Sequence, residues 1–346
     1  MKILVTGGAG FVGSHLCDKL LQQGSEVVCL DNFNHFYEHT LKRENISGCR
    51  QHEGFKLIEA DLLDMARIKS FCSAEKVDAV VHLAAYPGSR QSVQDPFSYE
   101  ENNVRGTLNI LHACKECAVS KFVFASTYAV YGLGFSLPFK ETLIPQRPAS
   151  PLAATKLAGE ALCHAYHHIY GIDMAILRYF SIFGPRQRPG SALHEFMKKG
   201  ILGRPVRKFG DGTTSRDYIY IDDAVDATIK AIEKCQGFEA YNIGSGSSVT
   251  VDEVLLLVSE ALGVGLQIEA AEPPLGVLPA SLADITKAKL KLGWKPAVTF
   301  QEGIGRLAEW MKSRNFDAGD RKSMPPAQGK GEPIPGGESS TGKDKE

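Results

Sequence analysis

The sequence lacks the features that mark membrane proteins, secreted proteins and nucleic-acid-binding proteins. No apolar run approaches the roughly 20 residues that a helix needs to cross a bilayer, and the amino terminus does not have the form of a signal peptide. Neither sign of charge dominates, since 39 Lys and Arg stand against 40 Asp and Glu. This balance gives no support to binding of nucleic acid or of a membrane surface.

Metal-binding patterns are also missing. The eight cysteines are scattered, and Cys114 and Cys117 form a close pair only within a helical pattern, without a second pair or a histidine at finger spacing. His164 and His168 are four residues apart on a predicted helix, but no third ligand is near them in the sequence. We therefore expect free thiols, no metal site and a reducing, cytoplasmic location.

The first 180 residues alternate short β-branched runs with longer amphipathic stretches. Such alternation predicts βαβ units and hence an α/β fold, a Rossmann doubly wound parallel sheet. The predicted strands are KILVTG, EVVCLD, FKLIEAD, DAVVHLA, KFVFAS and MAILRYF, and the predicted helices lie near 11–23, 64–74, 98–117 and 152–170.

After Phe180 the alternation breaks. RPVRKFGDGTTSRDYIYI predicts two short strands around a turn, and SALHEFMKKGIL, DDAVDATIKAIEK and TVDEVLLLVSEALG predict helices. We expect a Rossmann domain at 1–180 with return segments near 217–245, and a smaller α/β, mainly substrate-binding domain at 181–312. The Pro-, Gly-, Ser- and Lys-rich stretch 313–346 predicts a disordered tail.

A glycine pattern follows the first predicted strand. ILVTGGAGFVG places Gly7, Gly10 and Gly13 between a strand and a helix, where backbone N–H groups and the helix N-terminus can bind a pyrophosphate. The next strand ends in Asp31, about 20 residues further on. A carboxylate there accepts hydrogen bonds from a ribose diol and repels a 2′-phosphate. The pattern therefore predicts a dinucleotide site that prefers NAD to NADP.

Motifs in the same order as in a known family run from residue 1 to about residue 312. They are TGGAGFVGSHL, DLLD, VVHLAA, NNVRGTLNIL, FASTYAVYG, TKLAGE and LRYFSIFGPRQRP. With them the chain resembles the extended short-chain dehydrogenases/reductases, and within that family the nucleotide-sugar 4-epimerases. The resemblance implies a bound NAD that takes hydride from C4 of a UDP-sugar and returns it to the other face. It also implies a homodimer built on the helices near 98–117 and 152–170.

The resemblance assigns roles to individual residues. It implies that Thr127 binds the sugar hydroxyl and that Lys156 holds the nicotinamide ribose, while Arg90, Ser181, Arg188 and Arg216 reach the substrate. The residues that it places at the cofactor are Gly7, Gly10, Phe11, Val12, Asp31, Asn32, Asp61, Leu62, Leu83, Ala84, Ala85, Asn102, Ser126, Lys156 and Phe180.

One position departs from the family pattern. The family's Tyr-x-x-x-Lys pair uses the cation, one helical turn away, to lower the pKa of the phenol that accepts the O4 proton. In ASPLAATKLAGE the Lys is Lys156, but Leu152 stands where the Tyr belongs. Leu152 cannot carry a proton. A softer departure lies in PPLGVLPASLADITKA, where Pro274 and Val277 replace an Arg and an Asp that hold the diphosphate and the uridine ribose.

Three interpretations therefore stay open: a working or impaired epimerase, a non-catalytic binding protein and a changed reaction that uses Tyr128. Adjacent residues of a regular strand point to opposite faces, so Tyr128 can join Thr127 in a site only if the chain turns there. Otherwise Tyr128 packs against the neighbouring helix. Residues 128 and 129 carry no acid, which disfavours the family's dehydratases and decarboxylases. GPRQRP after RYFS resembles the UDP-glucuronate 4-epimerases, with UDP-glucose and UDP-N-acetylglucosamine as the next candidates.

Overall fold

Seven parallel strands form the central sheet of the computed structural model, which describes residues 1–314 and 316. Their order is β10-β6-β5-β4-β1-β2-β3. The strands are β1 (Lys2–Thr6), β2 (Glu26–Asp31), β3 (Phe55–Glu59), β4 (Ala79–His82), β5 (Lys121–Thr127), β6 (Asp173–Tyr179) and β10 (Phe238–Ile243). The prediction of a Rossmann doubly wound sheet is confirmed, and β10 comes from the predicted return segment.

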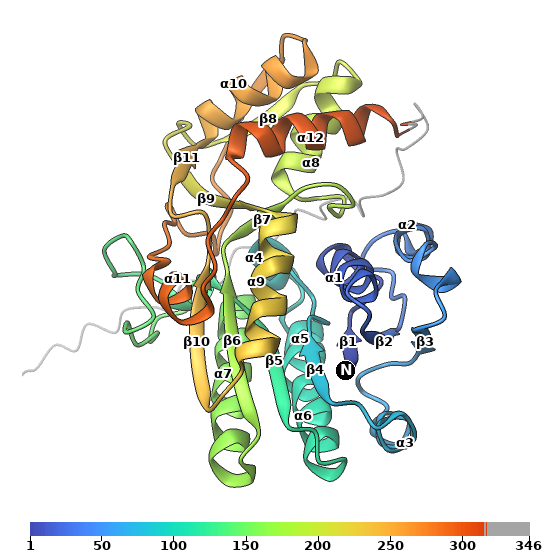
Figure 1. The fold of residues 1–346 in the computed structure, drawn as a ribbon. Coiled ribbons are helices and arrows are strands. Elements are labelled where there is room, and N and C mark those ends of the chain that lie inside the picture. Colours follow the sequence, from blue (N-terminus) through green and yellow to red (C-terminus); the bar gives the residue numbers. More distant parts are fainter. Residues whose placement is uncertain (315, 317–346) are drawn as a thin grey trace, which may run out of the picture. The chain divides into compact units, whose positions relative to one another are not determined.

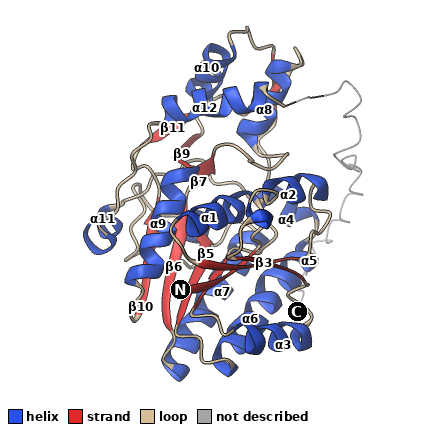
Figure 2. Ribbon diagram, turned by 45° about the vertical axis from the view of Figure 1, so that its right-hand side comes forward, coloured by secondary structure: helices blue, strands red, loops and turns tan. Residues whose placement is uncertain are grey.

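Helices cover the sheet, which explains why its strands are continuous apolar runs. The helices near the sheet are α1 (Phe11–Gln22), α2 (His39–Asn45), α3 (Met65–Glu75), α4 (Ser89–Gln94), α5 (Pro96–Glu100), α6 (Gly106–Glu116), α7 (Pro151–Tyr170) and α9 (Ile221–Lys234), with short 3-10 turns η1 (Cys49–Gln51) and η3 (Tyr128–Tyr131). α1 packs against α9 (Figures 1 and 2). Alternate strand residues such as Leu4, Val80, Phe122 and Ile176 form a hydrophobic core with α3, α6 and α7.

The helix predicted near 98–117 is present, but it is not α-helical throughout. α5 and α6 are joined by a π-helical segment, η2 (Glu101–Arg105). A π turn holds one more residue than an α turn and is frequent at functional sites. The segment carries Asn102, which lies at the pocket described below.

The chain after Phe180 builds a second group of elements at the carboxyl end of the sheet (Figure 1). β7 (Ser181–Phe183), β9 (Ser215–Tyr220) and β11 (Ser248–Thr250) form one small sheet, and β8 (Val206–Phe209) pairs with β12 (Ile268–Ala271). The two strands predicted around a turn are therefore present as β8 and β9, but they belong to different sheets. The helices here are α8 (Ala192–Ile201), α10 (Val251–Leu262) and α12 (Phe300–Lys312), whereas α11 (Thr286–Leu292) packs against β10 and α9 of the first group.

Three further properties concern the described residues. None of the helices in residues 1–314 combines the length and apolar composition that spanning a bilayer requires. The same part of the chain contains no cluster of His, Cys, Asp and Glu arranged to hold a metal ion. All eight cysteines are free thiols. The predicted tail lies, from residue 317 onward, outside the described residues.

Candidate functional site

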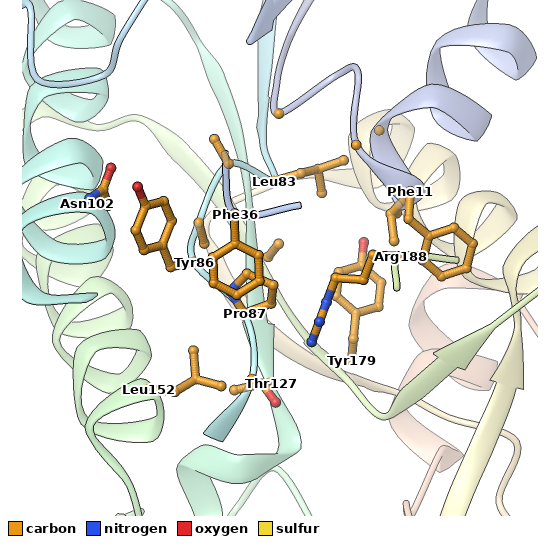
Figure 3. Close-up of a pocket in the computed structure, with 18 of the residues that line it drawn as sticks. Phe11, Phe36, Leu83, Tyr86, Pro87, Asn102, Thr127, Leu152, Tyr179 and Arg188 are labelled. Carbon is orange, nitrogen blue, oxygen red and sulfur yellow. The ribbon is translucent and has the colours of Figure 1, made fainter. Parts of the chain in front are cut away.

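One pocket lies where the strands of the central sheet end, and it brings together residues that are far apart in the sequence (Figure 3). Every residue that the sequence analysis placed at the cofactor lines this pocket. Of the predicted catalytic and substrate residues, Thr127, Tyr128, Ser181 and Arg188 line it as well. The carboxyl edge of a doubly wound sheet, where the strand order reverses, is the usual place for a ligand in such folds.

The glycine loop is shaped by contacts that leave no room for side chains. Gly7 has φ +69°, and a Cβ on it would lie 2.9 Å from the backbone of Ala84. A Cβ on Gly13 would lie 2.2 Å from the carbonyl oxygen of Gly7. Gly10 is the N-cap of α1 and provides no side-chain cap. The first-turn N–H groups of α1 therefore face the pocket without a side-chain acceptor, as a phosphate site requires.

Asp31 ends β2 beside the glycine loop. Its carboxylate accepts hydrogen bonds from the backbone N–H of Ala9 at 3.2 Å and of Phe33 at 2.9 Å. The ammonium of Lys42 lies 3.6 Å from Asp31 Oδ1 and donates to Asn34 Oδ1 at 2.9 Å. Burial lowers the pKa of Lys42. Lys42 lines the pocket but was not predicted, because the sequence around it shows only a short polar helix.

Leu152 and Lys156 lie one turn apart on the same face of α7, and both line the pocket. The helix begins there because Ser150 accepts a hydrogen bond from Ala153 N–H at 3.3 Å and Pro151 occupies the first helical position. Leu152 is 8% exposed, so its isobutyl group is an apolar part of the pocket wall. Figure 3 shows it beside Thr127.

Lys156 is a buried cation with a backbone partner. Its ammonium donates to the carbonyl oxygen of Ala125 at 2.6 Å and lies 4.9 Å from the ring centroid of Phe124. Burial lowers its pKa to about 8. Lys156 is therefore held by the end of β5 while it lines the pocket.

The chain turns sharply after Thr127, which brings Tyr128 into the pocket. η3 begins directly after β5, and Thr127 Oγ1 accepts a hydrogen bond from Ala129 N–H at 3.3 Å. The ring of Tyr128 stacks on Phe180, with centroids 5.2 Å apart and planes inclined by 22°. The turn required for Tyr128 to share the site with Thr127 is thus present, and the ring stacks on Phe180, the residue that follows β6.

Arg188 projects into the middle of the pocket (Figure 3). Its guanidinium donates to the carbonyl oxygen of Pro189 at 3.3 Å and lies 5.5 Å from the ring centroid of Phe36. Burial and the neighbouring charge of Arg90 lower the pKa of Arg188. In the described part of the chain, no carboxylate forms an ion pair with it. A desolvated cation without a counter-ion favours an anionic ligand.

Two predicted substrate residues do not line the pocket. Arg90 lies on α4. Arg216 donates to the carbonyl oxygens of Ser215 at 2.7 Å, Leu278 at 2.6 Å and Pro279 at 3.2 Å. Its guanidinium is therefore occupied by backbone from the 278–279 loop, a long-range contact that local sequence does not reveal.

Buried polar residues support the pocket from behind. Asn103 accepts from Tyr86 N–H at 2.8 Å and donates to Thr155 Oγ1 at 3.2 Å, which connects η2 to the loop after β4 and to α7. His82 lies between Thr6 Oγ1 at 2.7 Å and Thr107 Oγ1 at 3.0 Å. Burial lowers the pKa of His82 to about 3, so it is neutral and structural.

Comparison with known proteins gives the same family as the motifs. Residues 3–244 match the NAD dependent epimerase/dehydratase family, and the chain belongs to that family. UDP-glucuronate 4-epimerase of Thermodesulfobacterium geofontis is 37% identical over 310 residues, which cover 89% of this chain and 95% of that protein.

Solved structures of related proteins share the fold. UDP-glucuronic acid 4-epimerase from Bacillus cereus, in complex with UDP-glucuronic acid and NAD, is 37% identical with a TM-score of 0.85, and the match covers 90% of this chain and 99% of that one. A tyrosine-to-phenylalanine mutant of the same enzyme forms a complex with UDP-4-deoxy-4-fluoro-glucuronic acid and NAD. UDP-glucose 4-epimerase from Thermotoga maritima, with UDP-glucose, is 34% identical with a TM-score of 0.84, over 90% of this chain and 99% of that one.

Proposed function

We propose that this protein binds NAD and a UDP-sugar and interconverts the two configurations at C4 of the sugar by oxidation and re-reduction, but slowly. The observation that carries the proposal is the single pocket that joins the glycine loop, Asp31, Lys156 and Thr127. The relatives of this chain include a UDP-sugar 4-epimerase solved with NAD, which the chain matches over nearly its whole length. Because Leu152 lines the same pocket, turnover is expected to be impaired.

The residues present fit a dinucleotide. Gly7, Gly10 and Gly13 leave room at the N-terminus of α1 for a pyrophosphate, and Asp31 provides acceptors for a ribose diol. Two buried polar atoms of pocket residues, Tyr37 Oη and Gln187 Oε1, have no hydrogen-bond partner in the described structure. Buried groups of this kind are usually paired, so a polar ligand is expected beside them. When bound, NAD would supply the hydride acceptor for the C4 alcohol.

The proton step is where this chain is deficient. Removal of hydride from C4 requires that the O4 proton leave, and a positioned general base contributes about 10²–10⁴-fold to such a step. Thr127 can bind the hydroxyl of the sugar. Its own hydroxyl is too weakly acidic to lose its proton unaided, so it cannot act as the base alone. Leu152 has no titratable group, and Lys156 donates to Ala125. The residues of the pocket therefore support binding and orientation better than rapid turnover.

Arg188 supports a carboxylated sugar as the preferred substrate. Its guanidinium projects into the pocket and has no ion-pair partner among the described residues. A carboxylate on the sugar would neutralise this charge. Ser181, which is near Arg188 in the sequence, lines the same pocket. UDP-glucuronate is therefore our first choice, followed by UDP-glucose and UDP-N-acetylglucosamine.

Two alternatives rest on particular observations. Leu152 favours a protein that binds NAD and a nucleotide sugar without turnover. The position of Tyr128 in the pocket favours a changed reaction in which its phenolate takes the proton. The experiment is to incubate the purified protein with UDP-glucuronate, UDP-glucose and UDP-N-acetylglucosamine, resolve the products, and release and quantify bound nicotinamide. Slow epimerisation supports the proposal. Bound ligands without product support the binding protein, and no nicotinamide, before or after soaking, contradicts both.

A homodimer belongs to the same proposal. Phe97, Leu108, Ile169 and Tyr170, on α5, α6 and α7, are 84%, 38%, 63% and 45% exposed. Exposed apolar side chains on neighbouring helices suit a helical interface between two copies. Light scattering of the purified chain tests it, and a monomer at micromolar concentration contradicts it.

A further inference from the structure

We propose that Phe36 and Tyr37, called here the clasp, close over the dinucleotide in the pocket and slow its release. The inference rests on the NAD binding proposed above, and it concerns retention of the cofactor rather than its initial recognition. Neither residue was predicted from the sequence, and both line the pocket. They belong to the loop between β2 and α2, which follows Asp31.

Phe36 connects this loop to the opposite wall of the pocket. Its ring lies 5.3 Å from that of Tyr86, in the loop after β4, and 5.5 Å from the guanidinium of Arg188. Figure 3 shows Phe36 between these two side chains. The clasp thus spans the pocket between two segments far away in the sequence. A ligand beneath it cannot leave without separating Phe36 from Tyr86 and Arg188.

Tyr37 contributes a buried hydroxyl that lacks a partner. Its oxygen is inaccessible and forms no hydrogen bond in the described structure. Burial raises the pKa of Tyr37; the charge of Asp31 also raises it, and that of Arg188 lowers it. The phenol lines the same pocket as Asp31, at the predicted ribose site, and the guanidinium of Arg188. A ligand that extends from Asp31 towards Arg188 passes this hydroxyl and can accept its hydrogen bond.

The loop that carries the clasp is held by a few side-chain contacts. Asp31, Asn32 and Asn34 each accept a hydrogen bond from the backbone N–H two residues later, at 2.9, 3.0 and 3.3 Å. Phe33 has a φ of +49°. No strand or helix fixes residues 32–38, so the clasp can open while β2 and α2 stay in place. Ligand release should therefore depend on Phe36 and Tyr37 more than on overall stability.

The test compares NAD release from the full-length wild type, Tyr37→Phe and Phe36→Ala. Each protein is loaded with NAD, transferred into excess thionicotinamide analogue, and sampled for retained NAD. We expect release roughly 5- to 20-fold faster for Tyr37→Phe, from one lost hydrogen bond, and at least tenfold faster for Phe36→Ala. Leu290→Ala, which removes a 78% exposed apolar side chain on α11, is the control and should release NAD at the wild-type rate.

Thermal unfolding distinguishes a role of the clasp residues in holding NAD from a role in the stability of the fold. Without NAD, Tyr37→Phe should melt at or above the wild-type temperature, because it removes an unpaired buried hydroxyl. With NAD, its rise in melting temperature should be smaller than that of the wild type. If the wild type retains NAD and both clasp variants release it at the same rate, the clasp is wrong and the proposed function stands. If the wild type binds no NAD, both proposals fail.

Discussion

Glu160 and Arg178 form a buried ion pair directly behind the pocket. Arg178 Nε lies 3.0 Å from Glu160 Oε1, and Nη2 lies 2.7 Å from Oε2. The same carboxylate accepts a hydrogen bond from Ser126, the neighbour of Thr127. Glu160 is one turn beyond Lys156 on α7. The pair therefore fixes the helix that carries Lys156 against the ends of β5 and β6.

Breaking this pair should be costly. Glu160→Gln leaves the charge of Arg178 buried without its partner, and we expect the free energy of unfolding to fall by about 3 kcal/mol. Urea unfolding of the apo protein measures it. The control is Glu302→Gln, which breaks the exposed pair with Arg306, 2.6 Å apart, and should cost at most about 0.5 kcal/mol. Equal losses in both variants would refute the role given to Glu160.

Restoring a phenol at position 152 should restore turnover. Leu152→Tyr places a titratable hydroxyl one turn from Lys156, and epimerisation of UDP-glucuronate should rise about 10²–10⁴-fold. Leu152→Phe supplies the same ring without the hydroxyl and should stay at the parent rate. Product analysis over time measures both. A comparable gain with Phe would show that the ring's packing, rather than its proton, limits the parent.

The burial of Lys156 predicts a pH dependence of stability. Its pKa is about 8 in the folded protein and near 10.5 when unfolded, so between these values the unfolded chain binds more protons. The destabilisation caused by burying the charged ammonium is therefore complete below pH 8. It is relieved as the pH rises and Lys156 loses its proton in the folded protein. From pH 7 to pH 9 the wild type should gain about 1 kcal/mol relative to Lys156→Met. Urea unfolding at both values measures the difference, and parallel changes in the two proteins would contradict it.

Arg188 should determine the preference for a carboxylated sugar. Arg188→Met should weaken binding of UDP-glucuronate about 10- to 100-fold, the size of a charge-assisted hydrogen bond, and that of UDP-glucose much less. Calorimetric titration of the NAD-loaded protein measures both affinities. Equal losses for the two sugars would instead place the guanidinium on the diphosphate.

The two glycines Gly13 and Gly305 should respond in opposite directions to alanine. A Cβ on Gly13 would lie 2.2 Å from Gly7 O, so Gly13→Ala should abolish NAD binding and cost at least about 2 kcal/mol. A Cβ on Gly305, inside α12, meets nothing within 4 Å. Gly305→Ala should therefore add up to about 1 kcal/mol and leave NAD binding unchanged. The free energy of unfolding and the content of bound nicotinamide measure both effects. Retention of NAD by Gly13→Ala would contradict the role given to the glycine loop.

Most of the sheet, and the part of the pocket wall at the carboxyl ends of its strands, could be predicted from the sequence because both depend on local patterns. Gly7, Asp31 and Thr127 each stand where a buried strand stops, and parallel strands bring such ends to one edge. The remainder depends on contacts between distant segments. Arg216 is occupied by carbonyls of Leu278 and Pro279, some 60 residues later. Phe36 and Tyr37 lie in a loop without periodicity, so their position over the pocket could not be read from spacing.

The extra residue in the π-helical segment Glu101–Arg105 makes chain length itself a constraint at this place. Loss of one residue there would let the segment wind as an ordinary α-helix, and α5 and α6 would keep nearly their present orientation, because a π turn absorbs one extra residue without turning the flanking helices. The widened turn that carries Asn102 at the pocket would be lost, while both flanking helices kept their packing. A substitution in this stretch keeps the widened turn, whereas a single-codon deletion would remove it and change the pocket wall at Asn102.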